Sequence, residues 1–134
     1  MGVLLALAMT LQTGSPVQTI VRDMMSQVDA PAQAVARTPA EWTALWRRHS
    51  GDTAAPNVDF GTRAVVAVFL GARPTPGFSV EITAARQQGG VVIVEWREHR
   101  PSRDTIMAQV LTSPAHFASI PKFAGDITFQ KVEP

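Results

Sequence analysis

Hydrophobic and polar positions follow two different periods along this chain, and the first of them predicts a helix. Four large side chains recur at the spacing i, i+3, i+4 and i+7, which places them on one helical face. Before them, Thr38-Pro39-Ala40-Glu41 is a capping box with proline at the first helical position, and Gly51 follows. We therefore expect a helix over about residues 39–49. It should pack on a sheet through Trp42, Leu45, Trp46 and His49.

The second period is that of β-strands. Residues 63–70 are apolar at nearly every position, which favours a central strand buried on both faces. From Phe78 onward apolar and polar residues alternate. After a turn at residues 87–90 the chain returns over residues 91–97, as in a β-hairpin. Shorter runs predict further strands at residues 17–21, 33–37, 105–111, 116–120 and 126–132.

The order of these elements predicts the fold class. One early helix followed by a run of hairpin-connected strands is typical of an α+β domain dominated by an antiparallel β-sheet. We expect that sheet to curl into a small sandwich or half-barrel, with the helix packed on it. The length of 134 residues fits one domain, and 46% hydrophobic with 17% charged residues is the balance of a globular fold.

Charge and cysteine content narrow the classes of function. The net charge is +1 and the arginines are dispersed, so the chain lacks the basic stripe with interleaved aromatic residues that is typical of nucleic-acid binding. We therefore expect no nucleic-acid partner. The sequence contains no cysteine, which excludes disulfides, thiolate metal ligands and cysteine nucleophiles.

The first residues form a short apolar segment. Residues 1–14 fall below the roughly 18 apolar residues that a stable membrane span needs. The segment includes Ala6-x-Ala8, a small-residue pattern typical of signal-peptide cleavage, although a basic region before it is missing. We favour the remnant of a truncated signal peptide, which leaves residues 15–134 as a single exported domain, periplasmic or extracellular. The alternative is a short strand or helix at the start of a cytosolic domain.

The histidines do not form a metal-binding pattern. A zinc site needs three or four ligands at one place, and the three histidines share no such spacing. His49 is expected to interact with the negative end of the helix dipole, His99 to lie exposed in a turn, and His116 to face either side of its strand. We therefore expect no metal site and no cofactor.

Acid–base and nucleophilic catalysis have no better support in the sequence. Glu81, Glu95 and Glu98 are expected on the polar faces of the hairpin, paired with cross-strand arginines such as Arg86. Ser79 lacks the Gly-x-Ser-x-Gly context and enters a strand rather than a helix. A hydrolase would need Ser79, a histidine and a carboxylate within hydrogen-bond reach. We expect no such cluster and no catalytic residue.

Residues 71–78 form the most distinctive segment of the chain. Two glycines and two prolines within seven residues fix a loop of defined shape, because proline locks φ and glycine admits positive φ. The loop holds neither a nucleophile–base pair nor metal ligands. A loop of this kind either shapes a turn or presents a surface to a partner.

Several motifs, taken together, resemble a known family. They are Glu41-Trp42-x-x-Leu45-Trp46, Pro56-x-Val58-Asp59-Phe60, the strand at residues 65–71, Arg73-Pro74-Thr75-Pro76-Gly77-Phe78 and Leu111-Thr112-Ser113-Pro114-x-His116. Over about residues 40–130 the chain resembles the PrcB C-terminal domain family of bacterial exported proteins. The resemblance implies a role in supporting the stability of an extracellular protease complex, and it brings no catalytic residues. Pro76 and Phe78 depart from the family pattern, in which a small residue and a tyrosine are common.

These inferences combine into one expected function. We expect a non-enzymatic, exported protein-interaction domain that stabilises or assists a protease or another envelope protein complex, while its oligomeric state stays open. Arg73→Ala should then weaken partner binding and leave the melting temperature nearly unchanged. The expected contact residues are Arg73, Pro74, Thr75, Gly77, Phe78, Arg100 and Pro101.

The alternative function is inhibition of a protease. Residues 73–78 are similar to the Pro-Thr-Thr-Gly-aromatic loop of chagasin-type inhibitors of cysteine proteases. Gly89-Gly90 and Arg100-Pro101 follow in the same order as the other two binding loops of those inhibitors. The mechanism requires residues 75–78 to project beside Gly89 and Arg100 as one exposed edge. A fully buried Phe78 would exclude it.

Overall fold

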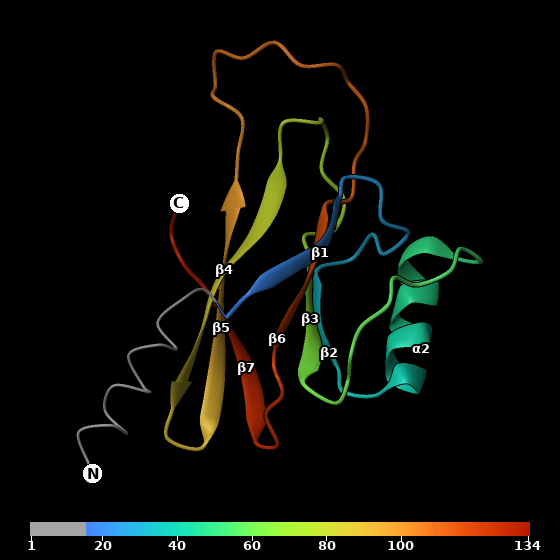
Figure 1. Ribbon diagram of the computed structural model, residues 1–134. Helices are drawn as coiled ribbons and strands as arrows, with labels where there is room; N and C mark the ends of the chain where they lie inside the picture. Colours follow the sequence, from blue (N-terminus) through green and yellow to red (C-terminus); the bar gives the residue numbers. More distant parts are fainter. Residues whose placement is uncertain (1–15) are drawn as a thin grey trace.

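Figure 1 shows a computed structural model of the protein, which describes residues 16–134 as three layers: a helix, a four-stranded sheet and a three-stranded sheet. The predicted α+β sandwich is confirmed. The leader predicted at residues 1–14 lies outside the described residues, so it stays a prediction, as does the single domain at residues 15–134. No helix within residues 16–134 is long and apolar enough to cross a membrane.

The predicted helix and most of the predicted strands are confirmed, with ends that shift by up to two residues. The elements are β1 (Gln18–Asp23), β2 (Ala32–Ala36), α2 (Pro39–Ser50), β3 (Arg63–Phe69), β4 (Ser79–Gln88), β5 (Val91–His99), β6 (Ala115–Pro121) and β7 (Asp126–Lys131). The strand predicted at residues 105–111 is wrong, because this segment has no neighbouring strand to pair with and is irregular and mostly exposed.

Helix α2 begins and ends where its sequence signals lie. The Thr38 hydroxyl accepts a hydrogen bond of 3.1 Å from the backbone N–H of Glu41, and the Glu41 carboxylate accepts one of 2.7 Å from the N–H of Arg37. At the other end Gly51 has φ 67°, and its N–H donates to the Arg47 carbonyl. These contacts satisfy backbone groups that a helix end leaves without partners.

Strand β3 lies between β6 and β2 and is buried on both faces, as predicted. Its residues point alternately to the two sides, so Val66 and Val68 face the second sheet while Val65 and Ala67 face α2. This arrangement explains the continuous apolar run in the sequence. It also divides the apolar interior into one core between the sheets and another beneath the helix.

The connections between the strands differ from the predicted run of hairpins. Only β4 and β5 form the expected hairpin. The chain then crosses to the first sheet, where β6 lies between β1 and β3, and returns as β7, which pairs with β5 in parallel. The return occurs at the end where β5 begins, so the two strands run in the same direction (Figure 1). The predicted hairpin connection is therefore wrong for β7, while the other strand pairs are antiparallel as expected.

Candidate functional site

Two connections meet at one end of the molecule, at the top of Figure 1. One is residues 71–78, between β3 and β4, and the other is residues 100–114, between β5 and β6; together they are the loop end. The backbones of Arg73 and Thr112 exchange two hydrogen bonds, of 2.7 and 2.9 Å. The Thr112 hydroxyl also donates to the Thr75 carbonyl at 3.1 Å. These contacts join the two connections into one braced unit.

Two glycines allow this close packing. A Cβ on Gly77 would lie 2.6 Å from the Cβ of Pro101 and 3.0 Å from the Cε of Met107, so any larger residue would push the two connections apart. Gly71 has φ +81°, which favours glycine, and a Cβ there would lie 2.8 Å from the backbone nitrogen of Pro31. The loop therefore has the defined shape that its composition indicates.

A buried carboxylate forms the base of the loop end. Glu98 is only 3% exposed, and its Oε2 lies 2.9 Å from the Nε of Arg73. Its Oε1 lies 3.4 Å from the Nζ of Lys131 and 3.7 Å from a guanidinium nitrogen of Arg100. Burial alone raises the pKa of Glu98, but the hydrogen bond and charge of Arg73, with Lys131 and Arg100, outweigh it and hold the pKa below its ordinary value. Glu98 is therefore an ionised side chain shared by three cations.

The structure corrects the predicted position of Glu98. We expected all three hairpin glutamates on polar faces, but Glu98 lies on the inner face with Val94 and Trp96, four and two residues before it. The same alternation that identifies the strand carries this information. Glu95 does pair across the strands with Arg86, at 3.0 Å, as expected.

Arg73 serves the fold rather than standing free as a binding residue. Besides its ion pair with Glu98, its guanidinium donates to the carbonyls of Leu70 and Ala72, both at 3.1 Å. Its Cζ lies 5.8 Å from the centre of the Phe78 ring, within the range of a cation–π contact. The expectation that Arg73 contributes little to stability therefore needs revision.

Replacing Arg73 with alanine is expected to lower the free energy of unfolding by roughly 2 kcal/mol, because it removes the closest cation from a buried carboxylate. The cost stays below that of a fully isolated buried charge, since Lys131 and Arg100 remain near Glu98. Arg100→Ala is the matched control. Its side chain is 69% exposed and 3.7 Å from Glu98, so about 0.5 kcal/mol or less is expected. Urea unfolding of both variants checks the difference, and equal effects would contradict it.

The other predicted contact residues lie in different environments at the loop end. Pro74 and Arg100 are exposed, whereas Thr75, Gly77, Phe78 and Pro101 are partly buried. The Thr75 hydroxyl is buried and has no hydrogen-bond partner. The structure therefore brings all seven candidate residues to one end, and their contact with a partner stays a prediction.

The three-loop edge required of a chagasin-like inhibitor does not form. In the β4–β5 hairpin, Ser79 pairs with His99 at one end and Gln88 pairs with Val91 at the other. Gly89 therefore lies a full strand away from Arg100, roughly 30 Å at 3.3 Å per residue. Phe78 is partly buried and does not decide the question by itself. The separation of Gly89 from the loop end overturns the inhibitor hypothesis.

A serine, a histidine and a carboxylate share the outer face of the hairpin, a convergence that we did not expect. The Nε2 of His99 lies 2.8 Å from Glu81, and Ser79 is opposite His99 in the ladder. Within the described part of the chain, however, Ser79 makes no hydrogen bond with His99. The His99 and Glu81 side chains are 43% and 39% exposed. The cluster lacks the nucleophile–base contact that activates a serine.

The other two histidines are buried and structural. His49 lies against Ser26 at 2.8 Å and Asp23 at 3.3 Å. Burial lowers its pKa more than Asp23 raises it, so the expected interaction of a charged imidazole with the helix dipole does not dominate. His116 faces the space between the two sheets and accepts a hydrogen bond from Ile82. Within residues 16–134, no three His, Asp or Glu side chains gather where a metal ion could bind.

An apolar feature at and beside the loop end was not predicted from the sequence. All large apolar side chains that are exposed within residues 16–134 fall into two short segments, and we call them the apolar group: Met24, Met25, Ile106, Val110 and Leu111. The two segments are joined through Ser113, whose N–H donates to the Met24 carbonyl at 2.8 Å and whose carbonyl accepts from the Ser26 N–H at 3.0 Å. The strand predicted at residues 105–111 concealed this feature, because it assigned the apolar residues to a sheet face.

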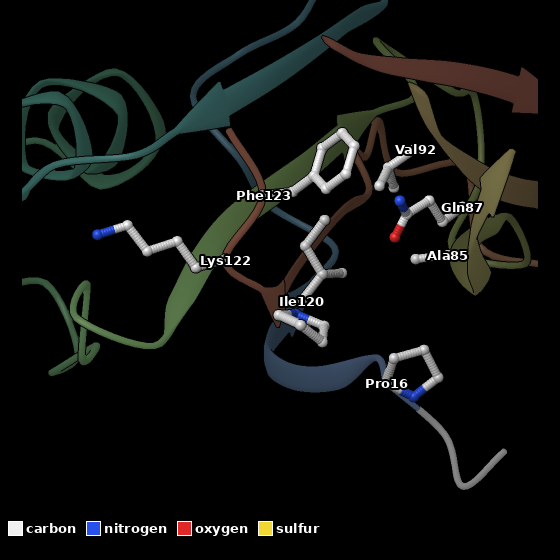
Figure 2. Close-up of a pocket in the computed structure, with 8 residues that line it drawn as sticks. Pro16, Ala85, Gln87, Val92, Ile120, Lys122 and Phe123 are labelled. Atoms are coloured by element: carbon white, nitrogen blue, oxygen red, sulfur yellow. The ribbon is translucent and has the colours of Figure 1, made fainter. Parts of the chain in front are cut away.

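A cavity of about 550 Å³ lies at the opposite end, between β4, β5 and the chain after β6. Figure 2 shows its apolar lining, with the Gln87 amide as a polar group and the Lys122 side chain pointing away. A bulge between Ile82 and Ala84 turns Ala85 and Gln87 toward this side. The described residues that line it include no carboxylate, imidazole or hydroxyl, and the amine of Lys122 points away from the cavity.

Comparison with known proteins gives the family of the segment that contains the loop end. Residues 64–121 match the family model described as PrcB C-terminal. This segment belongs to the PrcB C-terminal family. It runs from β3 to the end of β6, so the resemblance seen in the sequence is confirmed there. No curated protein and no solved structure gives a significant match.

Proposed function

We propose that this protein is a non-enzymatic, exported protein-interaction domain that binds its partner through the loop end and stabilises or assists a protease or another envelope protein complex. The matched segment belongs to the PrcB C-terminal family. At the level of the family, this fits a domain that associates with a protease and supports its stability. The matched segment contains both connections of the loop end. The loop end is therefore the surface through which this family role would be carried out.

One observation carries the proposal: a braced loop holds apolar side chains in water. Ile106 is 97% exposed, while its neighbour Met107 packs toward Gly77 and anchors the loop. Exposed apolar groups of this kind are typical of interaction sites. A loop whose shape is already fixed loses little conformational entropy on binding, so its contacts contribute more fully to affinity.

The side chains of residues 16–134 support a role without catalysis. His116 is buried with a pKa lowered to about 4, so it is neutral near pH 7 and bonded within the fold. Ser79 has no base in hydrogen-bond contact, and the described residues that line the cavity in Figure 2 include no carboxylate, imidazole or hydroxyl. The loop end contains arginines and apolar groups rather than a reactive pair.

The proposed location is the periplasm or the extracellular space. Its support is the apolar segment at residues 1–14 with the small-residue pattern Ala6-x-Ala8. Cell fractionation of the tagged full chain tests this location separately from partner binding, with a cytosolic marker as the control. Retention of the whole pool with that marker would contradict export.

Site-specific photo-crosslinking tests the function. A photoreactive amino acid at position 106 is expected to capture an exported protein in the producing cell, because Ile106 is exposed in the proposed surface. The matched control is position 43, where Thr43 is exposed on α2 away from the loop end. The captured protein should be degraded faster in a strain that lacks this chain. Equal capture from both positions, or an unchanged half-life, would overturn the proposal.

A further inference from the structure

We propose that the loop end binds an acidic amphipathic peptide segment of the partner. The apolar side chains of that segment would cover the apolar group, and its Asp or Glu side chains would contact Arg100 and Arg103. This inference rests on the proposed function and adds the chemistry of the bound segment. It moves the main contact from residues 71–78, which brace the loop end, to residues 100–111 and the chain after β1.

The apolar group provides the first half of the argument. Ile106, Leu111 and Met25 are 97%, 70% and 62% exposed. They come from two segments that Ser113 joins through backbone hydrogen bonds. Figure 1 shows the chain after β1 beside the base of the 100–114 connection, whose far part extends to the top of the view. The exposed groups therefore extend from the base of this connection into the loop itself, a distribution that suits a peptide lying along it.

The charges around the apolar group provide the second half. The loop end contains three arginines and one acidic residue, Asp104. Arg73 forms an ion pair with Glu98. Arg100 is 69% exposed, and its 3.7 Å distance to Glu98 is the longest of the three, since Arg73 and Lys131 lie closer to the same carboxylate. Arg103 is exposed as well. Exposed cations beside exposed apolar groups are complementary to a segment that combines apolar side chains with carboxylates.

Two other occupants fit these observations less well. A second copy of this chain would bring the same excess of arginines against itself, which like-charge repulsion opposes. A membrane surface would contact the far part of the 100–114 connection and leave Met25, near its base, uncovered. Protein association also agrees with the family of the matched segment. The peptide is therefore the occupant to which the geometry points.

The bracing explains why residues 71–78 would act indirectly. The polar groups of Arg73 and the carbonyl of Thr75 are used by Glu98 and Thr112 within the fold. Gly77 is packed against Pro101 and Met107. These contacts hold Pro101, Met107 and Thr112 in place, and the exposed side chains of that connection remain for a partner.

A random peptide library displayed on phage tests the inference on the full chain. Selection on the wild-type protein is expected to enrich peptides with large apolar residues next to Asp and Glu. The affinity of a selected synthetic peptide, measured by fluorescence anisotropy, should fall about tenfold or more on Arg100→Glu with Arg103→Glu. A similar fall is expected on Ile106→Ser with Leu111→Ser, because both apolar side chains are exposed. Higher salt should also weaken binding.

Arg47→Glu with Arg48→Glu is the matched control, since both arginines lie on exposed positions of α2, and it should bind the peptide as the wild type does. Enrichment of basic peptides, equal weakening by the control, or no enrichment would overturn the inference. Two other results would overturn the inference if no peptide is bound. One is self-association in sedimentation velocity that is lost on Ile106→Ser with Leu111→Ser. The other is binding to phosphatidylglycerol vesicles that is lost in the same variant. If position 106 still captures an exported protein in the cell, only the acidic chemistry fails; if it captures none, the proposed function fails.

Discussion

Phe117→Ala is expected to lower the free energy of unfolding by about 4 kcal/mol, the largest effect of any single substitution considered for this protein. Phe117 is completely buried in the core beneath α2. Its ring lies 4.7 to 5.6 Å from the rings of Trp42, Trp46, His49 and Phe69. Truncation removes this burial and leaves a cavity that rigid neighbours on a strand and a helix cannot fill. Urea unfolding measured by circular dichroism checks the value.

Phe78→Ala is the matched control for Phe117→Ala. The same side chain is removed, but Phe78 is only partly buried and contacts Arg73 at the loop end. A smaller loss of about 2 kcal/mol is expected, since part of the Phe78 side chain already lies in water and less apolar surface is uncovered by its removal. If both variants lose the same stability, the aromatic core beneath α2 is not the centre of the fold.

The helix and the central strand can be predicted from the sequence because their patterns are local. The apolar stripe at Trp42 and Trp46 and its capping residues define α2, and the unbroken run at residues 63–70 defines a strand buried on both faces. The pairing of β7 with β5 has no such local sign. It depends on β6 crossing into the other sheet, which is decided by packing between residues far apart in the chain.

The seven candidate residues lie at one end of the molecule, but the structure gives two of them bracing roles that were not predicted from the sequence. Proline and glycine identify residues 71–78, and the structure shows that Arg73 and Gly77 brace a second connection. The second connection was mistaken for a strand, because residues 105–111 form a short, mostly apolar run with β-branched residues, a composition that favours a strand even where no partner strand exists. Glu98 could have been found, since it continues the buried alternation through Val94 and Trp96.

His116 links the two sheets through a specific protonation state. The backbone N–H of Ile82 donates to its Nδ1 at 2.8 Å, so Nδ1 has no proton. The proton therefore resides on Nε2, which donates to the Thr19 hydroxyl at 2.9 Å. One ring joins β6 to β4 and β1, and the bond from Ile82 requires the neutral imidazole. Protonation of Nδ1 would place two hydrogens against each other in a buried space.

The second large effect follows from this geometry and concerns pH. The pKa of His116 is lowered from 6.5 to about 4, mainly by burial and next by the charge of Arg22, against a smaller opposite effect of Glu81. Because the folded pKa lies below the unfolded one, the neutral ring stabilises the fold fully above pH 6.5. That stability is lost as the pH falls toward 4 and amounts to roughly 3 kcal/mol.

His116→Gln isolates this contribution, because glutamine can accept the hydrogen bond from Ile82 but does not titrate. The pKa of His49 is also lowered, so it adds to the acid sensitivity of both proteins and cancels when they are compared. The stability of the wild type relative to His116→Gln should therefore decrease by roughly 3 kcal/mol between pH 6.5 and 4, as measured by urea unfolding. A difference that stays constant with pH would mean that His116 is charged or solvated in the fold. Its ring would then not join the two sheets in the neutral form that the hydrogen bond from Ile82 requires.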